Sequence, residues 1–135
     1  MKILDANNNL LAQVIKPFDD KSPKNFFTEN ELDFQAASFQ LEKDEKIERH
    51  IHNNQERIIH TTSEAIIVTE GLISVEIYDI DLNFIQDVNV NSGEVILLFA
   101  GGHAISMIEN SKFLEIKQGP YDEKMTNKDF NDSCI

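Results

Sequence analysis

The clearest chemical pattern in the chain is the sequence His50-Ile51-His52. Successive side chains of a β-strand point to opposite faces, so a strand here would direct both imidazoles to one place. Two more ligand-type residues follow, Glu64 and His103, and the chain has only four histidines. Neutral imidazole and carboxylate ligands together suit Zn, Fe, Mn, Ni or Cu. The spacing therefore predicts a metal site, with two exposed histidines on a half-solvated strand as the simpler interpretation.

The surroundings of Glu64 and His103 are compatible with buried ligands. Glu64 opens an expected strand and shares its face with apolar residues, where a carboxylate is costly unless it is paired or binds a metal. His103 follows Gly101 and Gly102, which let the backbone bend or approach another segment closely, and it shares a face with Met107. The alternatives stay open: Glu64 as an exposed strand-end residue, and His103 as a core histidine hydrogen-bonded to a carbonyl group.

Two segments resemble the two characteristic motifs of the cupin family. The first segment has Asp44 in place of the family's leading glycine, followed by the His-x-His pair and then by Glu64 and Gly71 at the family's spacing. The link from His52 to Glu64 is longer than in the family. The motifs follow one another in the family's order, with strand patterns between them.

The second segment runs from Gly93 to His103 and resembles the family's second motif. Phe99 stands where the family has proline, one residue is missing before the histidine, and Met107 stands where the family has asparagine. The resemblance covers residues 34–120.

The resemblance implies a single-domain, all-β chain with a cupin-type jelly-roll barrel. It also implies one divalent metal ion, Fe, Mn, Zn or Ni, held by His50, His52, Glu64 and His103. Such a protein would act on a small polar molecule, for example one derived from a carbohydrate, by isomerisation, oxygenation or lyase chemistry. A fold resemblance does not establish catalysis, so whether the chain is an enzyme stays open.

Two other functions are compatible with the same resemblance. One is a metal-free sugar-nucleotide isomerase or epimerase, in which a cavity histidine acts as general base. The other is a non-catalytic module that binds or senses a small ligand. Many cupins pair through edge strands, so a homodimer is expected, with Leu10–Ile15, Phe26 and Phe27 as the candidate contacts.

Four further residues are candidates for substrate contacts: Arg57, His60, Tyr78 and Met107. The guanidinium of Arg57 matches carboxylate and phosphate groups, although a rim salt bridge is the simpler role. His60 lies between the two motifs, where a surface position is the plainer interpretation. Tyr78 and Met107 are equally compatible with filling the interior of a barrel.

The composition of the chain argues against several kinds of partner and cofactor. The net charge of −12 repels phosphate backbones and anionic membrane surfaces, so neither nucleic acid nor membrane is an expected partner. Cys134 is the only cysteine, which leaves no intramolecular disulfide and no cysteine-based metal cluster. The first residues lack the apolar core of a signal peptide, and no apolar run is long enough to span a membrane. A cytoplasmic location is the resulting expectation.

Short strands are expected about every ten residues between turn-forming residues, which is typical of an all-β sandwich or barrel. We expect an N-terminal strand and loop over 1–33, a barrel over 34–120 and a polar tail over 121–135. The expected strands are 10–16, 34–41, 47–53, 57–61, 64–70, 72–80, 84–90, 94–99, 103–108 and 112–117.

Overall fold

The computed structural model describes residues 1–125, and within them the chain is all-β, as expected. The elements are β1 (Lys2–Leu4), β2 (Leu10–Ile15), β3 (Lys24–Phe26), β4 (Ala37–Phe39), β5 (Glu64–Glu70), β6 (Leu72–Tyr78), β7 (Phe84–Asn91), β8 (Val95–Leu98), β9 (Gly102–Met107), β10 (Lys112–Lys117) and a 3₁₀-helix, η1 (Glu123–Met125).

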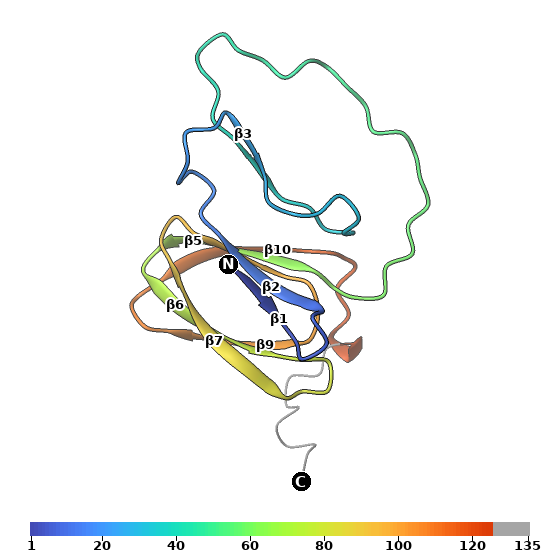
Figure 1. Cartoon of the computed structure of the whole chain (residues 1–135), viewed down its shortest axis with the longest axis vertical. Coiled ribbons are helices and arrows are strands. Elements are labelled where there is room, and N and C mark those ends of the chain that lie inside the picture. Colours follow the sequence, from blue (N-terminus) through green and yellow to red (C-terminus); the bar gives the residue numbers. More distant parts are fainter. Residues whose placement is uncertain (126–135) are drawn as a thin grey trace.

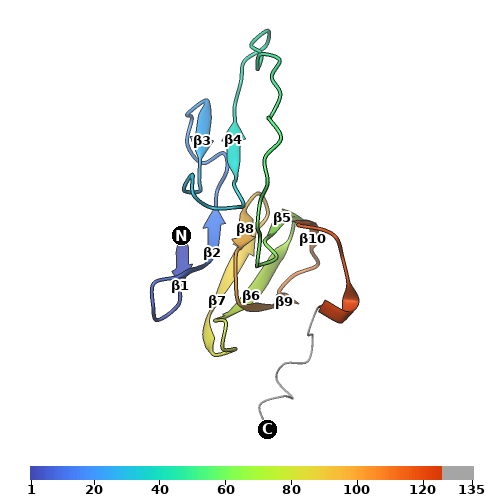
Figure 2. The same ribbon diagram turned by 90° about the vertical axis from the view of Figure 1, so that its right-hand side faces the viewer.

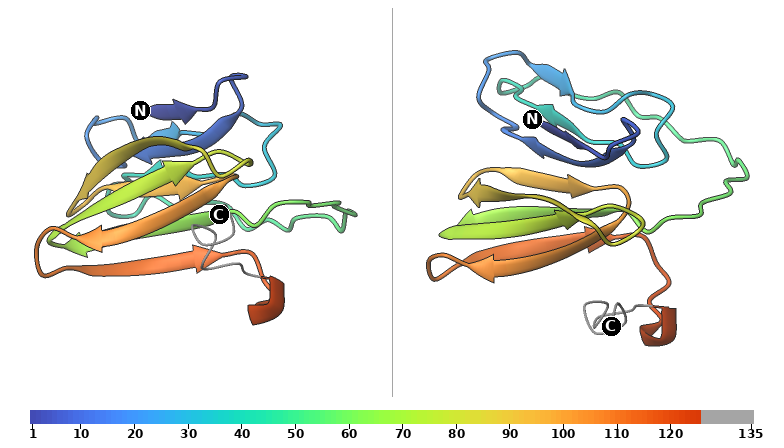
Figure 3. Two further views of the ribbon diagram at one scale, coloured as in Figure 1. Left: turned by 90° about the horizontal axis from the view of Figure 1, so that it is seen from below. Right: turned by 60° about the horizontal axis from the view of Figure 1, so that its bottom comes forward.

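The strands form three antiparallel sheets. Their orders are β1-β2-β8-β5-β10, β7-β6-β9 and β3-β4, and none of the three closes on itself within the described residues. The two larger sheets lie face to face, as Figures 1 and 3 show. The two larger sheets thus form a sandwich, and the predicted all-β class is confirmed, whereas a closed jelly-roll barrel remains a prediction.

The main hydrophobic core lies between the two larger sheets. Alternating residues of each sheet point into it, which follows from the period of two in a strand. Ile66 and Ile96 enter from the five-stranded sheet, and Ile73 and Val75 enter from the three-stranded sheet; all four are fully buried. This core holds the two sheets at a fixed separation and so positions the residues at their ends.

A second, smaller core covers part of the outer face of the five-stranded sheet. Ala65 and Leu97 of that face pack against Phe27 and Phe34, which lie in the connection between β3 and β4. The side chain of Gln13 in β2 connects the β3–β4 hairpin to the five-stranded sheet, because its Nε2 donates a hydrogen bond of 2.9 Å to the carbonyl oxygen of Phe27. Figure 2 shows the hairpin standing beyond the end of the sandwich.

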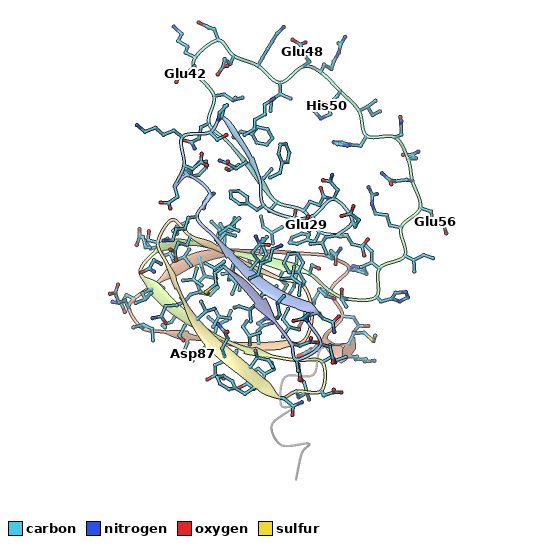
Figure 4. The ribbon with its side chains drawn as sticks, in the orientation of Figure 1. Glu29, Glu42, Glu48, His50, Glu56 and Asp87 are labelled. Atoms are coloured by element: carbon cyan, nitrogen blue, oxygen red, sulfur yellow. The ribbon has the colours of Figure 1, made fainter. Side chains whose placement is uncertain are left out.

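The long connection between β4 and β5 differs most from expectation. The predicted strands 47–53 and 57–61 are wrong, since this connection has no regular secondary structure, and the predicted strand 34–41 shrinks to Ala37–Phe39. Residues 41–62 are all exposed, and Figure 4 shows their side chains along an arc away from the sandwich. Alternation alone does not supply the neighbouring strand that a β-strand needs for its backbone hydrogen bonds.

The remaining predicted strands are confirmed within one or two residues at each end. No helix in residues 1–125 has the length and apolar character needed to cross a membrane. Cys134 and most of the predicted polar tail, residues 126–135, lie outside the described residues.

Candidate functional site: the Glu64–His103 pocket

Two of the predicted ligand residues, Glu64 and His103, meet at one end of the sandwich. Nε2 of His103 lies 3.3 Å from Oε2 of Glu64, and the two side chains are 30% and 12% exposed. Glu64 begins β5, an inner strand of the five-stranded sheet next to the edge strand β10, and His103 lies on β9, at the edge of the three-stranded sheet. The pair therefore bridges the two sheets.

The strand pattern explains why Glu64 points inward. It lies on the same face of β5 as Ile66 and Val68, which are fully buried in the main core. Its neighbours across the sheet are Leu98 of β8 and Lys117 of β10. The carboxylate thus occupies the last core-facing position before the end of the strand, where the interior opens to solvent.

Gly101 sets the position of His103. Its φ of +76° lies in the left-handed region that glycine tolerates, and a Cβ there would collide with the carbonyl oxygen of Tyr78. This close approach brings the start of β9 against the end of β6, where His103 pairs with Ile77. Of the two glycines identified in the sequence, Gly101 is therefore the one whose conformation positions the histidine.

The charges around Glu64 favour its ionised form. His103 beside it is the main cause that lowers the pKa of the Glu64 carboxyl; burial opposes this, and Lys117, whose Nζ lies 4.0 Å from Oε1, adds to the lowering. Despite the short distance to His103, the buried Oε2 has no aligned hydrogen bond within residues 1–125. One carboxylate oxygen therefore faces a ring nitrogen without the hydrogen bond that burial normally requires.

A pocket of about 600 Å³ opens beside the pair. Its lining is mixed in polarity and comes from the ends of β5, β9 and β10 and from the chain that follows β10. The lining residues are Thr61, Thr62, Glu64, Leu82, Ala100, Gly101, Gly102, His103, Glu115, Lys117, Gln118, Pro120, Tyr121, Asp122 and Met125.

Acidic groups predominate in this pocket. Three carboxylates (Glu64, Glu115 and Asp122) line it, against one lysine, Lys117. Nζ of Lys117 lies 3.6 Å from Oε2 of Glu115 and 5.2 Å above the ring of Tyr121, so it is already held by its neighbours. The pocket is consequently suited to neutral or cationic groups more than to phosphates.

The other two predicted ligands, His50 and His52, do not reach the pocket. Both are exposed within residues 41–62, their ring centroids lie 5.2 Å apart, and Nδ1 of His50 donates a hydrogen bond of 2.9 Å to the carbonyl oxygen of Glu48. Residues 1–125 contain no group of three or more potential ligands close enough to hold a metal. The structure therefore gathers two of the four predicted ligands.

The four candidate substrate contacts also lie outside the lining. Arg57 and His60 are exposed in the same connection as the two histidines. The Tyr78 hydroxyl donates a hydrogen bond of 2.5 Å to Glu76, and Met107 is half-exposed at the far end of β9.

Lys117, Glu115 and Tyr121 line the pocket although the motifs did not single them out. The alternation in β10 indicates that Glu115 and Lys117 share one face of the strand. What the sequence lacked was the pairing of Lys117 with Glu64 across the sheet.

The predicted dimer contacts are only partly available. Leu10–Ile15 is a mostly buried strand that pairs with β1 on one side and β8 on the other, so it is not a free edge. Phe26 is exposed, and Phe27 packs in the second core. The homodimer itself stays a prediction, and its contact has to be sought elsewhere.

Comparisons with protein-family models, with curated proteins and with solved structures found no match to this chain. The site is therefore interpreted from its own geometry.

Proposed function

We propose that the chain is an enzyme for a small polar molecule whose chemistry takes place at Glu64 and His103, with a divalent metal ion as their shared partner. The observation that carries this proposal is the buried Oε2 of Glu64, which faces Nε2 of His103 at 3.3 Å without an aligned hydrogen bond in the described chain. A cation is one partner that offsets the cost of such a buried acceptor. An ionised carboxylate and an imidazole are both common ligands of Zn, Fe, Mn and Ni.

Two protein ligands are fewer than such metal sites generally use. The connection that leads directly into β5 carries further residues of suitable chemistry, among them the neighbouring imidazoles of His50 and His52. Within residues 1–125, the hydrogen bonds and ion pairs of residues 41–62 join neighbours in the same connection, such as Lys46 and Glu48 at 3.2 Å. We therefore propose that metal binding draws this connection over the pocket. A bound divalent ion would polarise an oxygen of the substrate.

The residues of the pocket indicate the class of substrate. The excess of carboxylates favours a neutral, hydroxyl-rich molecule or one that carries an amine. Lys117, which is the only lysine of the lining within residues 1–125, is shared between Glu64 and Glu115. This arrangement disfavours a diphosphate and hence the sugar-nucleotide alternative. A carbohydrate-derived substrate without phosphate groups fits the proposal.

A second candidate function is metal-free proton transfer by His103. It is favoured by the position of the ionised Glu64, because a carboxylate beside an imidazole orients the ring. This pair is complete without any movement of residues 41–62. The same geometry is also compatible with a non-catalytic binding protein, for which turnover is the distinguishing measurement.

Metal content distinguishes the two candidates. The untagged protein is dialysed against Zn²⁺, Mn²⁺, Ni²⁺ or anaerobic Fe²⁺ and then against metal-free buffer, beside Glu64→Gln, the double variant His50→Gln/His52→Gln and the control His60→Gln. Metal-dependent function predicts about one retained ion per chain in the wild type and the control, and much less in the other two variants. Wild-type protein without retained metal would contradict it and leave proton transfer as the better account.

A further inference from the structure

The last strand of the five-stranded sheet, β10, is unusually open. The sheet order ends at β10, so within residues 1–125 one of its edges has no partner strand, and all six of its residues are exposed. Figure 3 shows β10 at the margin of the sandwich. Such an edge carries a row of backbone N–H and C=O groups that can pair with another strand.

The outer face of β10 is apolar. Leu114 and Ile116 share this face and are 55% and 50% exposed, although both are large aliphatic residues. Their cross-strand neighbours in β5, Ile67 and Ala65, belong to the same outer face. Ala65 lies in the second core, under Phe27 and Phe34, so the cover provided by residues 27–36 ends before it reaches β10.

The inner face of the same strand carries opposite charges at alternate positions. Glu115 and Lys117 both point to this face, with 3.6 Å between Oε2 and Nζ. Lys112, at the other end of the strand, is paired with Glu70 of β5 at 3.0 Å. The centre of the strand therefore lacks the lysines that commonly protect an exposed edge.

We propose that a second copy of this chain covers the β10 edge, with the two β10 strands antiparallel about a twofold axis at Ile116. In an antiparallel pair, residues directly opposite one another point to the same face. This register places the two Ile116 side chains opposite each other on the outer face. On the inner face it places each Glu115 opposite Lys117 of the second copy, which gives two equivalent ion pairs.

The neighbouring symmetric registers are less favourable. A twofold axis at Glu115 places the two glutamates opposite each other, and like charges directly opposite are destabilising. An axis at Leu114 places Lys112 opposite Ile116 and Phe113 opposite Glu115, which pairs apolar with charged side chains. Of these three registers, only the axis at Ile116 opposes unlike charges on the inner face and, within β10, places no charged side chain opposite an apolar one. It also places Lys117 of the second copy beside the Glu115 that lines the pocket, so the contact adjoins both pockets.

Reciprocal charge reversal tests this register. The single variants Glu115→Lys and Lys117→Glu each create two like-charge contacts, whereas a mixture of the two variants restores two opposite-charge contacts in a heterodimer. Sedimentation velocity should show a dimer for the wild type, a dissociation constant raised about tenfold or more for each single variant, and recovery of the dimer in the equimolar mixture. The charge pairs should matter less at high salt.

Two further variants keep the test independent of folding. Ile116→Lys, on the outer face of the strand, should also give a monomer, while Ile51→Lys, an exposed residue of the connection, should leave the dimer unchanged. Circular dichroism checks that each variant has the wild-type strand content. A monomeric wild type at about 100 μM, an open-ended polymer, or a mixture no more dimeric than its components would overturn the proposal. These measurements report the oligomeric state of metal-free protein, and Ile116→Lys tests the contact without changing a residue that lines the pocket.

Discussion

His103 and Glu64 lie on different sheets, yet Nε2 of one is 3.3 Å from Oε2 of the other. The contact joins the two halves of the sandwich at the end where the pocket opens. Its position depends on the core between the sheets and on the bend at Gly101. The site is therefore sensitive to changes far from the two charged groups.

Replacing His103 should change the ionisation of Glu64. His103 is the main cause of the lowered Glu64 pKa, so His103→Gln should raise that pKa, leaving burial as the dominant influence. The carbon resonance of the Glu64 carboxyl, followed by NMR across the acid range, measures this directly. His60→Gln is the matched control, because His60 is exposed in residues 41–62 and should leave the titration unchanged.

Acid stability should follow the same pair. Since the folded-state pKa of Glu64 lies below its usual value of 4.5, the ionised carboxylate stabilises the folded state above that pH. This contribution is lost as the pH falls through the lower folded-state pKa. The stability difference between wild type and His103→Gln that arises from Glu64 should therefore be largest above pH 4.5 and shrink in stronger acid. A difference that grows in acid, measured by urea unfolding, would contradict the assigned direction.

Truncation in the main core should be costly. Ile96 is fully buried between the sheets, so Ile96→Ala should lower the free energy of unfolding by about 2–5 kcal/mol. Ile51 is 86% exposed, and Ile51→Ala should change the free energy of unfolding by less than about 0.5 kcal/mol. Denaturant titration of both variants measures the contrast, and equal effects would show that Ile51 is packed in solution.

Gly101 and Gly93 provide a matched pair of glycine substitutions. Both have positive φ, so Gly→Ala at either position should cost about 1–2 kcal/mol in backbone strain. A Cβ at Gly93 meets no atom within 4 Å, whereas one at Gly101 collides with the carbonyl oxygen of Tyr78. Thermal unfolding should therefore be affected more strongly by Gly101→Ala. Similar losses of thermal stability in both variants would contradict the close approach of Gly101 to the carbonyl oxygen of Tyr78.

The exposed connection should be the first part of the chain that trypsin cleaves. Lys43, Lys46, Arg49 and Arg57 all lie in residues 41–62, which are exposed and without regular secondary structure. Mass spectrometry of early fragments should place the first cuts at these residues. If metal draws the connection over the pocket, one equivalent of Zn²⁺ should slow cleavage at Arg49 and Arg57 in the wild type. If metal-free and Zn²⁺-loaded protein are cleaved at these two residues at equal rates, that result would contradict the movement.

The hairpin-rich second half of the chain could be predicted from sequence because its information is local. Between β6 and β7 the turn is held by Asp79, whose carboxylate accepts hydrogen bonds of 2.9 Å from the backbone N–H groups of Asp81 and Asn83. Flanking residues alternate between apolar and polar, and each hairpin buries one face. Turn chemistry and alternation therefore agree with the final structure here.

The site could be predicted only in part, because its formation depends on contacts between distant segments. Alternation pointed to an inward Glu64 and the glycines to His103, and both lie in the pocket. The same alternation around His50 predicted a strand that the structure does not have, since no neighbouring strand is available to it. Lys117 was missed because its pairing with Glu64 is a matter of sheet order, which a local pattern does not contain.

The most direct test of the central claim is a Zn²⁺ titration followed through the four histidine imidazoles by ¹⁵N NMR. A metal site at the Glu64–His103 pair, completed by the exposed connection, predicts that the resonances of His103, His50 and His52 change together and saturate at one equivalent. His60 should stay unchanged and serves as the internal control. Changes confined to His50, His52 and His60, with His103 unaffected, would contradict the account and place metal binding outside the pocket.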